Sequence, residues 1–316
     1  MTDERTERTF VTPVPARLSL SNINGSVEIM AGSEAGVEGK IEVTAIKHLN
    51  TGNAQRTNIR IEQADDGKVT VRTDYNNGTF SWWFSERPCD VDYIVRLPPS
   101  CIVQVSGVTN SCSVQGLEGE ISLDTVSGPI AVKDLTGKLD LKSVSGKVSG
   151  EGLSGSLEYD TVSWRVHLAG SNLSTVRGNT VSGDILLETP LGEGPYHSSS
   201  VSGNLRLSLP QASACTILMS SVSGQVKTSL PVTGKWKDGR PHPGGDHHVE
   251  VLGGGREIHF NSVSGSLWLE SQNETGQVEL QAEMEAEKPQ PLSHQEILDK
   301  IDRGEMTVEQ ALDQLK

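Results

Sequence analysis

Hydrophobic and polar residues alternate through most of this chain, in short runs that end at glycine. In residues 125–142, Ile130 and Val132 alternate with small or charged residues, and Leu139 and Leu141 repeat the pattern after a Leu-Thr-Gly corner. Successive side chains of a strand point to opposite faces, so this period of two predicts half-buried β-strands rather than helices. Two short strands fit into each such segment.

A Val-Ser-Gly tripeptide marks a repeat of these strand pairs. The marks follow one another at steps of 21, 18, 18, 19, 20, 21 and 41 residues and begin at Val105, Val126, Val144, Val162, Val181, Val201, Val222 and Val263. A step near twenty residues is typical of stacked repeats, in which each strand pair buries its apolar face against its copies. The last step is about two ordinary ones, which indicates a repeat that has lost its mark near the His-rich segment 242–248.

The sequence therefore predicts an all-β fold, a β-solenoid (β-helix) of about 20-residue repeats, with a short C-terminal two-helix hairpin. We expect strands spaced about 4.8 Å apart along the solenoid axis. Alternation places the valine of each mark inside and the two hydroxyl residues beside it outside, as two aligned columns. These columns predict either a solvated polar face or, more specifically, a hydroxyl array for ice or glycan.

The patterns divide the chain into five segments. We expect a disordered N-terminus, an irregular β cap, the regular solenoid, an acidic linker and a helical hairpin over residues 1–12, 13–104, 105–281, 282–292 and 293–316. The hairpin is predicted from capping-box patterns at Ser293 and Thr307, each followed by apolar residues at helical spacing. Helices of about ten residues are unstable alone, so they must dock on the solenoid or on another chain.

The marked repeats resemble the candidate-adhesin β-strand repeat family, also called Toastrack, over residues 15–281. The resemblance lies in the recurrent Thr/Ser-Val-Ser-Gly corners and in residues 91–98, which look like the strand that leads into the first marked repeat. Residues 293–316 are similar to the SHOCT-like helical hairpins that accompany this repeat in bacteria. The resemblance implies a bacterial non-catalytic scaffold, in some cases linked with envelope-stress or membrane-associated signalling. Trp164 departs from the pattern, because it stands where glycine is usual.

Charge and composition narrow the classes of partner. The chain has 27 Lys and Arg against 41 Asp and Glu, for a net charge of −14, and no basic run, which disfavours nucleic acid and anionic lipid as partners. The charged start lacks the apolar core of a secretory signal, and eighteen apolar residues never run together. We therefore expect a cytoplasmic protein without direct membrane insertion.

The cysteines and histidines do not form a recognisable metal or redox motif. The four cysteines lack Cys-x-x-Cys spacing and are predicted to be free, buried thiols: Cys89, Cys101, Cys112 and Cys215. The segment His242 to His248 could bind a metal through imidazole and carboxylate groups. Adjacent histidines on a Gly/Pro-rich loop usually point apart, however, so no metal or cofactor is predicted.

Two regions carry the apolar residues expected to bind a partner. The first is aromatic and packs over the cap or is exposed for an interaction; the second is the apolar stripe of the hairpin. The candidates are Trp82, Trp83, Phe84, Trp164, Ile297, Leu298, Ile301, Leu312 and Leu315.

Catalysis is not expected. The chain lacks a Gly-x-Ser-x-Gly elbow, a phosphate-binding loop and a His-Glu-x-x-His motif. Asp124 and Asp160 stand two residues before their marks, whereas Asp184 stands three residues after its mark, so the three do not form one acidic column. The function expected from the sequence is a non-catalytic bacterial scaffold that binds protein partners, or itself, through the C-terminal hairpin. The alternative is an adhesin or glycan-binding surface protein.

Overall fold

The computed structural model describes residues 3–32, 39–75, 87–163, 165–233 and 243–272. The chain separates into two units, Met1–Ser271 and Gln272–Lys316, and all described secondary structure belongs to the first. These residues contain 22 strands. Among them is no helix that is long and apolar enough to span a membrane. The predicted hairpin, 293–316, lies outside the described residues.

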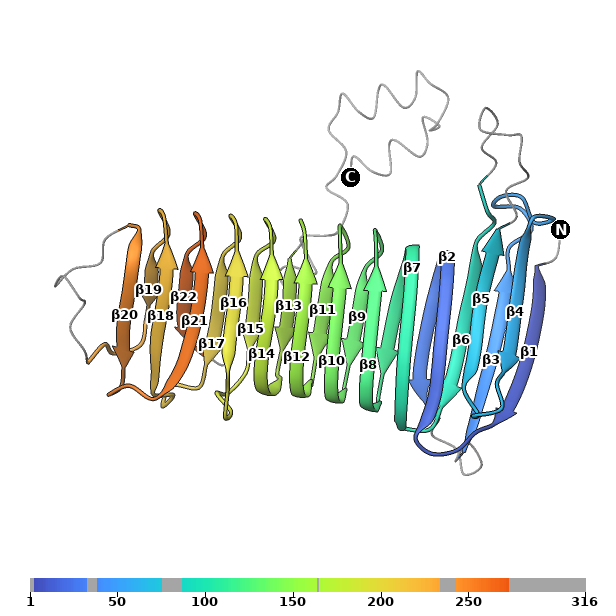
Figure 1. Ribbon diagram of the computed structural model, residues 1–316, viewed down its shortest axis with the longest axis horizontal. Coiled ribbons are helices and arrows are strands. Elements are labelled where there is room, and N and C mark those ends of the chain that lie inside the picture. Colours follow the sequence, from blue (N-terminus) through green and yellow to red (C-terminus); the bar gives the residue numbers. More distant parts are fainter. Residues whose placement is uncertain (1–2, 33–38, 76–86, 164, 234–242, 273–316) are drawn as a thin grey trace, which may run out of the picture. The chain divides into compact units, whose positions relative to one another are not determined.

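The regular part is a flattened coil that contributes one strand to each of two faces (Figure 1). The first face contains β8 (Glu118–Thr125), β10 (Thr136–Ser143), β12 (Ser154–Thr161), β14 (Asn172–Thr180) and β16 (Tyr196–Ser200). The second contains β9 (Ile130–Lys133), β11 (Val148–Glu151), β13 (Val166–Ala169), β15 (Ile185–Glu188) and β17 (Leu205–Leu209). Neighbouring strands on each face are parallel and pair in register, apart from a shift at Gly155 and Ser156 between β12 and β14. The predicted all-β solenoid is confirmed.

Regular stacking begins earlier than the sequence predicted. The long strands β2 (Ala16–Ala31) and β7 (Ser100–Gln115) run along both faces and pair with each other over nearly their whole length. The two halves of β2 then pair with β5 (Val69–Tyr75) and β6 (Val91–Leu97). The first coil is therefore formed by β2, far ahead of the expected boundary at residue 105.

Antiparallel strands complete the N-terminal end, and one of them corrects a prediction. β4 (Thr57–Gln63) pairs with β5, and β3 (Lys40–Lys47) pairs with β6. Residues 1–12 were expected to be disordered, but β1 (Glu4–Val11) pairs with β3 over all its eight residues. The reason is tertiary: β3 offers an unpaired backbone edge, and Phe10 packs against the core.

The C-terminal end departs from sequence order. It comprises β18 (Cys215–Ser221), β19 (Val226–Thr228), β20 (Gly245–Val251), β21 (Arg256–Ser262) and β22 (Leu267–Ser271). β21 lies between β16 and β18, and β22 lies between β17 and β19. β20 pairs antiparallel with the outer side of β18. The 41-residue step is therefore not a repeat without its mark, because the described residues between β19 and β21 contain the single antiparallel strand β20 instead of a parallel strand pair.

The core is a set of side-chain columns between the two faces. Ile121, Leu139 and Leu157 occupy equivalent positions on successive strands and are almost completely buried. The four cysteines are buried and free, as predicted. Burial raises the pKa of the Cys101 and Cys112 thiols to about 12, which makes them unreactive at neutral pH.

Candidate functional site: an exposed valine ladder

Most coils turn from the first face to the second at a Thr/Ser-Val-Ser-Gly corner. The first hydroxyl of the corner is buried and accepts a hydrogen bond from the glycine N–H three residues later. This bond measures 2.9 Å between Ser143 and Gly146, and 3.0 Å between Thr180 and Gly183. The bond satisfies a backbone donor that has no strand partner at the corner, so the hydroxyl residue must face inward.

The glycine of the corner is required by close stacking. A Cβ atom at Gly146 would overlap the carbonyl oxygen of Gly128 in the preceding coil, and one at Gly203 would overlap the carbonyl oxygen of Gly183. The backbones of successive corners therefore approach one another more closely than any side chain permits.

The serine of the corner ties each coil to the one before it. The Ser145 hydroxyl donates to the Val126 carbonyl at 3.1 Å, and the Ser182 hydroxyl donates to the Val162 carbonyl at 3.2 Å. These serines are exposed, but their protons are already used in the stack.

The valine of the corner points outward, which is a correction to the sequence-based expectation. The exposed fractions of these valines run from 42% to 76%, and along the axis they are Val108, Val126, Val144, Val162, Val181, Val201, Val263 and Val222. The inward hydroxyl residue and the bend after it shift the alternation, so valine and serine both face solvent. Of the two expected outward hydroxyl columns, only the column of corner serines faces solvent.

The first predicted mark was also out of phase. Val105 is buried within β7, and the corner position belongs to Val108, whose carbonyl accepts the N–H of Ser127 at 2.9 Å. The true first step is therefore that between Val108 and Val126.

We call the eight outward-facing corner valines, from Val108 to Val222 along the axis, the valine ladder. Eleven large hydrophobic side chains are exposed in the part of the chain that the structure describes, and eight belong to the ladder. At a strand spacing of about 4.8 Å, seven steps make a row on the order of 34 Å long. Neighbouring valines cover one another partly, and Val222, at the end of the row, is the most exposed at 76%. A row of this kind is an apolar surface on which a partner can pack.

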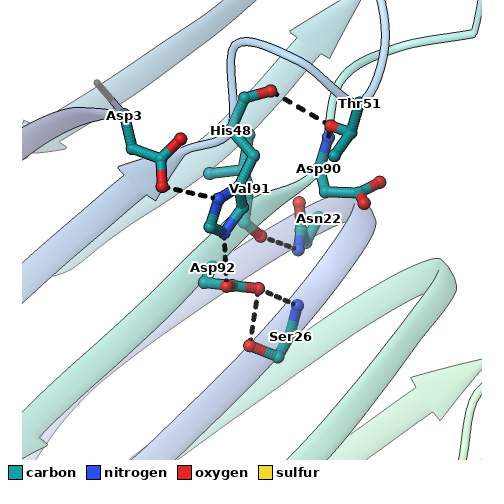
Figure 2. Close-up of polar contacts among 8 residues, drawn as sticks. All are labelled: Asp3, Asn22, Ser26, His48, Thr51, Asp90, Val91 and Asp92. Carbon is teal, nitrogen blue, oxygen red and sulfur yellow. Dashed lines mark hydrogen bonds and ion pairs between the residues drawn. The ribbon is translucent and has the colours of Figure 1, made fainter. Parts of the chain in front are cut away.

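A polar cluster at the N-terminal end of the solenoid centres on His48 (Figure 2). His48 Nε2 lies 2.7 Å from Asp92 Oδ2, and its Nδ1 lies 3.0 Å from Asp3 Oδ2. The other oxygen of Asp92 accepts hydrogen bonds from the Ser26 hydroxyl and N–H, both at 2.7 Å. The cluster joins the start of β1 to the end of β3, to β6 and to the bend of β2.

Electrostatics favour the charged forms of His48 and Asp92. The hydrogen bond with Asp92 raises the pKa of His48 above its usual value of 6.5, against the opposing effect of burial. Burial alone would raise the pKa of Asp92, but hydrogen bonds from Ser26 and His48 outweigh it and lower that pKa. Asp92 stands between the serine and the histidine, so the imidazole is not placed to activate the hydroxyl, as a nucleophilic pair requires. The cluster is therefore a structural clamp.

A shallow pocket of about 640 Å³ lies beside a histidine pair on β16 and β21. His197 and His259 are stacked with ring centroids 4.3 Å apart, and His259 Nε2 lies 3.0 Å from a Glu257 oxygen. Burial, together with the electrostatic effects of His259 and Arg177, lowers the pKa of His197. Within the described ranges, no three His, Cys, Asp or Glu side chains converge on a common metal position.

The residues singled out from the sequence are not tested by this geometry. Trp82, Trp83, Phe84, Trp164, Ile297, Leu298, Ile301, Leu312 and Leu315 lie outside the described residues, as does His242. Of the adjacent histidines, His247 is buried and His248 is exposed. The valine ladder was missed. The signal that could have found it is the hydroxyl residue three positions before each glycine, which is typical of a side chain that caps a turn.

The fold and its corners define a repeat protein of the β-solenoid class. The chain belongs to the Toastrack DUF4097 family, whose model matches residues 16–241.

Several solved structures resemble the chain at low identity. One is a candidate adhesin from Bacteroides fragilis NCTC 9343, with 11% identity, coverage of 85% of this chain and 97% of that chain, and a TM-score of 0.46. Another is a candidate adhesin from Parabacteroides merdae ATCC 43184, with 11% identity, coverage of 85% and 97%, and a TM-score of 0.41. A third is a candidate lipid-binding protein from Parabacteroides distasonis ATCC 8503, with 10% identity, coverage of 86% and 97%, and a TM-score of 0.40. No curated protein matches the chain.

Proposed function

We propose that this chain is a non-catalytic protein-interaction scaffold of the bacterial cytoplasm that binds a protein partner along the valine ladder. The ladder is the observation that carries the proposal, because it gathers most of the exposed large hydrophobic side chains of the described residues into one row. Isolated exposed valines are ordinary, whereas a continuous row is not.

The energetics favour a partner that covers several coils at once. Full burial of a valine contributes roughly 1.5 kcal/mol or more. The ladder valines are about half exposed, so each provides about half of that amount. Association costs at least about 4 kcal/mol in lost freedom of motion. A partner must therefore lie along the solenoid axis and contact most of the row, which suits an elongated apolar protein face.

A glycan-binding or adhesin function is the alternative, and the corner geometry weighs against it. Sugar hydroxyls need donors and acceptors, but the serine protons beside the ladder are already donated to carbonyls such as those of Val126 and Val162. The surface left between the serines is apolar. The proposal also includes the predicted hairpin, 293–316, as a second contact with the partner. Envelope-stress signalling is the process in which we propose that the scaffold acts.

The test uses isosteric substitutions on the ladder. In the triple variant Val144→Thr, Val162→Thr and Val181→Thr, the β-branched shape is kept and the surface becomes polar. A photo-crosslinking residue at Val201 should give discrete, saturable cross-links to partner protein in the native cell, and the triple variant should reduce them at least tenfold.

The matched control changes Val11 and Val232 to threonine, because both are exposed valines outside the ladder. This control should cross-link like the wild type. Equal cross-linking by the triple variant, with an unchanged strand signal in circular dichroism, would remove the basis of the proposal.

A further inference from the structure

The last coil of the solenoid, β21 and β22, fills a slot that other parts of the chain have already built. We propose that this coil, residues 256–271, exchanges between two copies of the chain, so that each copy fills the slot of the other. The partner is a second copy of this chain, and the interface is the slot between β16/β17 and β18/β19. This inference does not depend on the valine ladder.

The strand order shows the slot directly (Figure 1). From β17 the chain skips one position in the stack, forms β18 and β19, and then places β20 antiparallel outside β18. Only afterwards does it return to insert β21 between β16 and β18, and β22 between β17 and β19. Both walls of the slot therefore precede the inserted coil in the sequence.

The two walls of the slot form backbone hydrogen bonds with the corner of the inserted coil. The N–H of Val263 donates to the Ser200 carbonyl at 3.3 Å, and the N–H of Ser264 donates to the Val201 carbonyl at 3.0 Å. On the other wall, the N–H of Val222 donates to the Val263 carbonyl at 3.1 Å. A second copy supplies the same coil with the same corner, so every one of these contacts can form between chains.

The glycines of the slot make its fit selective. A Cβ atom at Gly265 would overlap the Gly203 carbonyl oxygen, and one at Gly224 would overlap the Gly265 carbonyl oxygen. Only a strand pair with glycine at this corner position can enter. The same coil of another copy meets that condition at every position.

One short hinge connects the inserted coil to the strands that precede it in the sequence. Leu252, Gly253 and Gly254 have φ values of 52°, 91° and 79°, and Leu252 is one of two residues other than glycine with positive φ in the described ranges. A leucine in this conformation is strained. The hinge must carry the chain from β20, on one side of β18, to β21 on the other side.

This geometry favours exchange for a simple reason. Opening the hinge releases the strain at Leu252, and the slot contacts that are lost within one chain are made again between two. Strained short hinges are known to promote such swaps, and a two-fold pair closes the arrangement. The equilibrium therefore depends mainly on hinge length and protein concentration.

The first experiment shortens the hinge in the full chain. Deleting Gly253 and Gly254 leaves too few residues to cross β18, so the coil must come from a second copy. Sedimentation at fixed concentration should show a shift from mainly monomer to mainly dimer, with the strand signal unchanged. As a matched control, inserting two glycines after Gly253 relaxes the hinge and should favour the monomer. A shortened chain that stays folded and monomeric overturns the proposal.

The second experiment detects the exchanged coil itself. Ser199 on β16 and Asn261 on β21 are direct neighbours in the pairing, and adjacent parallel strands lie within disulfide reach. The single variants Ser199→Cys and Asn261→Cys are mixed, partly unfolded, and refolded together at high concentration under reducing conditions. The oxidant is added only after refolding, when the native cysteines are buried again and do not compete.

A covalent heterodimer that joins one chain of each variant is the expected product, and the double variant in one chain should instead close within the monomer. This mixture keeps the full hinge, so it remains informative if the shortened chain does not fold. Refolded mixtures that contain no such heterodimer would overturn the exchange.

Discussion

The contact between Tyr159 and Gly178 allows the stacking of the core to be tested by mutation. Leu141, Tyr159, Gly178 and Ser198 occupy one inward column on four successive strands. The Tyr159 ring lies across Gly178, and its hydroxyl is 2.7 Å from the Ser198 hydroxyl, two strands away from its own. Tyr159 therefore fills the space that glycine and serine leave, and the three side chains fit as a set.

The change Gly178→Ala should destabilise the protein strongly. The added Cβ would overlap the Tyr159 ring, and the ring is fully buried and tied at its hydroxyl. Overpacking costs about 1 to 3 kcal/mol in the free energy of unfolding, and we expect the upper end because neither partner can move. Tyr159→Leu should cost about 2 to 4 kcal/mol, from the lost ring and the unpaired Ser198 hydroxyl.

The double variant distinguishes a specific clash between Gly178 and Tyr159 from a general sensitivity of the core to mutation. With leucine at 159 the new methyl group enters space that the ring has left, so the double variant should cost about 2 kcal/mol less than the sum of the single changes. Urea unfolding followed by the strand signal in circular dichroism measures all three. The pair Gly178→Ala and Tyr159→Phe is the matched control, because the ring and hence the clash remain. Additive costs within about 0.5 kcal/mol would refute the proposed fit.

Two further predictions concern the clamp and the corner. His48→Gln should lower stability most between about pH 4 and 6.5, because the raised pKa of His48 gives a contribution that is complete below 6.5 and lost as pH rises through the folded value. The lowered pKa of Asp92 gives a contribution that is present above 3.8 and lost at lower pH. An unfolding difference that does not fade as the pH rises through the raised pKa of His48 would contradict the clamp. Thr180→Ala should cost about 1 to 3 kcal/mol in urea unfolding, since the Gly183 N–H loses its buried acceptor. Ser182→Ala, on the exposed side of the same corner, should cost clearly less, and equal costs would argue against the turn-capping role.

The strand content and the coaxial stack follow from local sequence. Alternation in segments such as residues 125–142 indicates strands, and a step near twenty residues indicates copies that pile on one another. Two short strands are marginally stable alone, and stacked copies bury one another's apolar sides. The buried free cysteines follow in the same way from their spacing and from the composition of the chain.

Only the tertiary structure shows that the corner valines face solvent. Extending the strand alternation through the corner places Val126 inside, whereas the hydroxyl of Thr125 must face the backbone of the turn. One hydrogen bond in each coil therefore outweighs the burial of one valine, because an unpaired backbone donor inside the stack costs more than an exposed methyl pair.

The position of the last coil was likewise decided in three dimensions. The corners that begin at Ser200, Ser221 and Ser262 carry the same Ser-Val-Ser-Gly pattern, so each fits equally well against either of the others. The sequence alone determined that these coils stack. The antiparallel strand β20 and the hinge after it decided the order of the coils along the axis. The three coils share the corner glycine and the same parallel pairing, so the path of the connecting chain distinguishes their places in the stack.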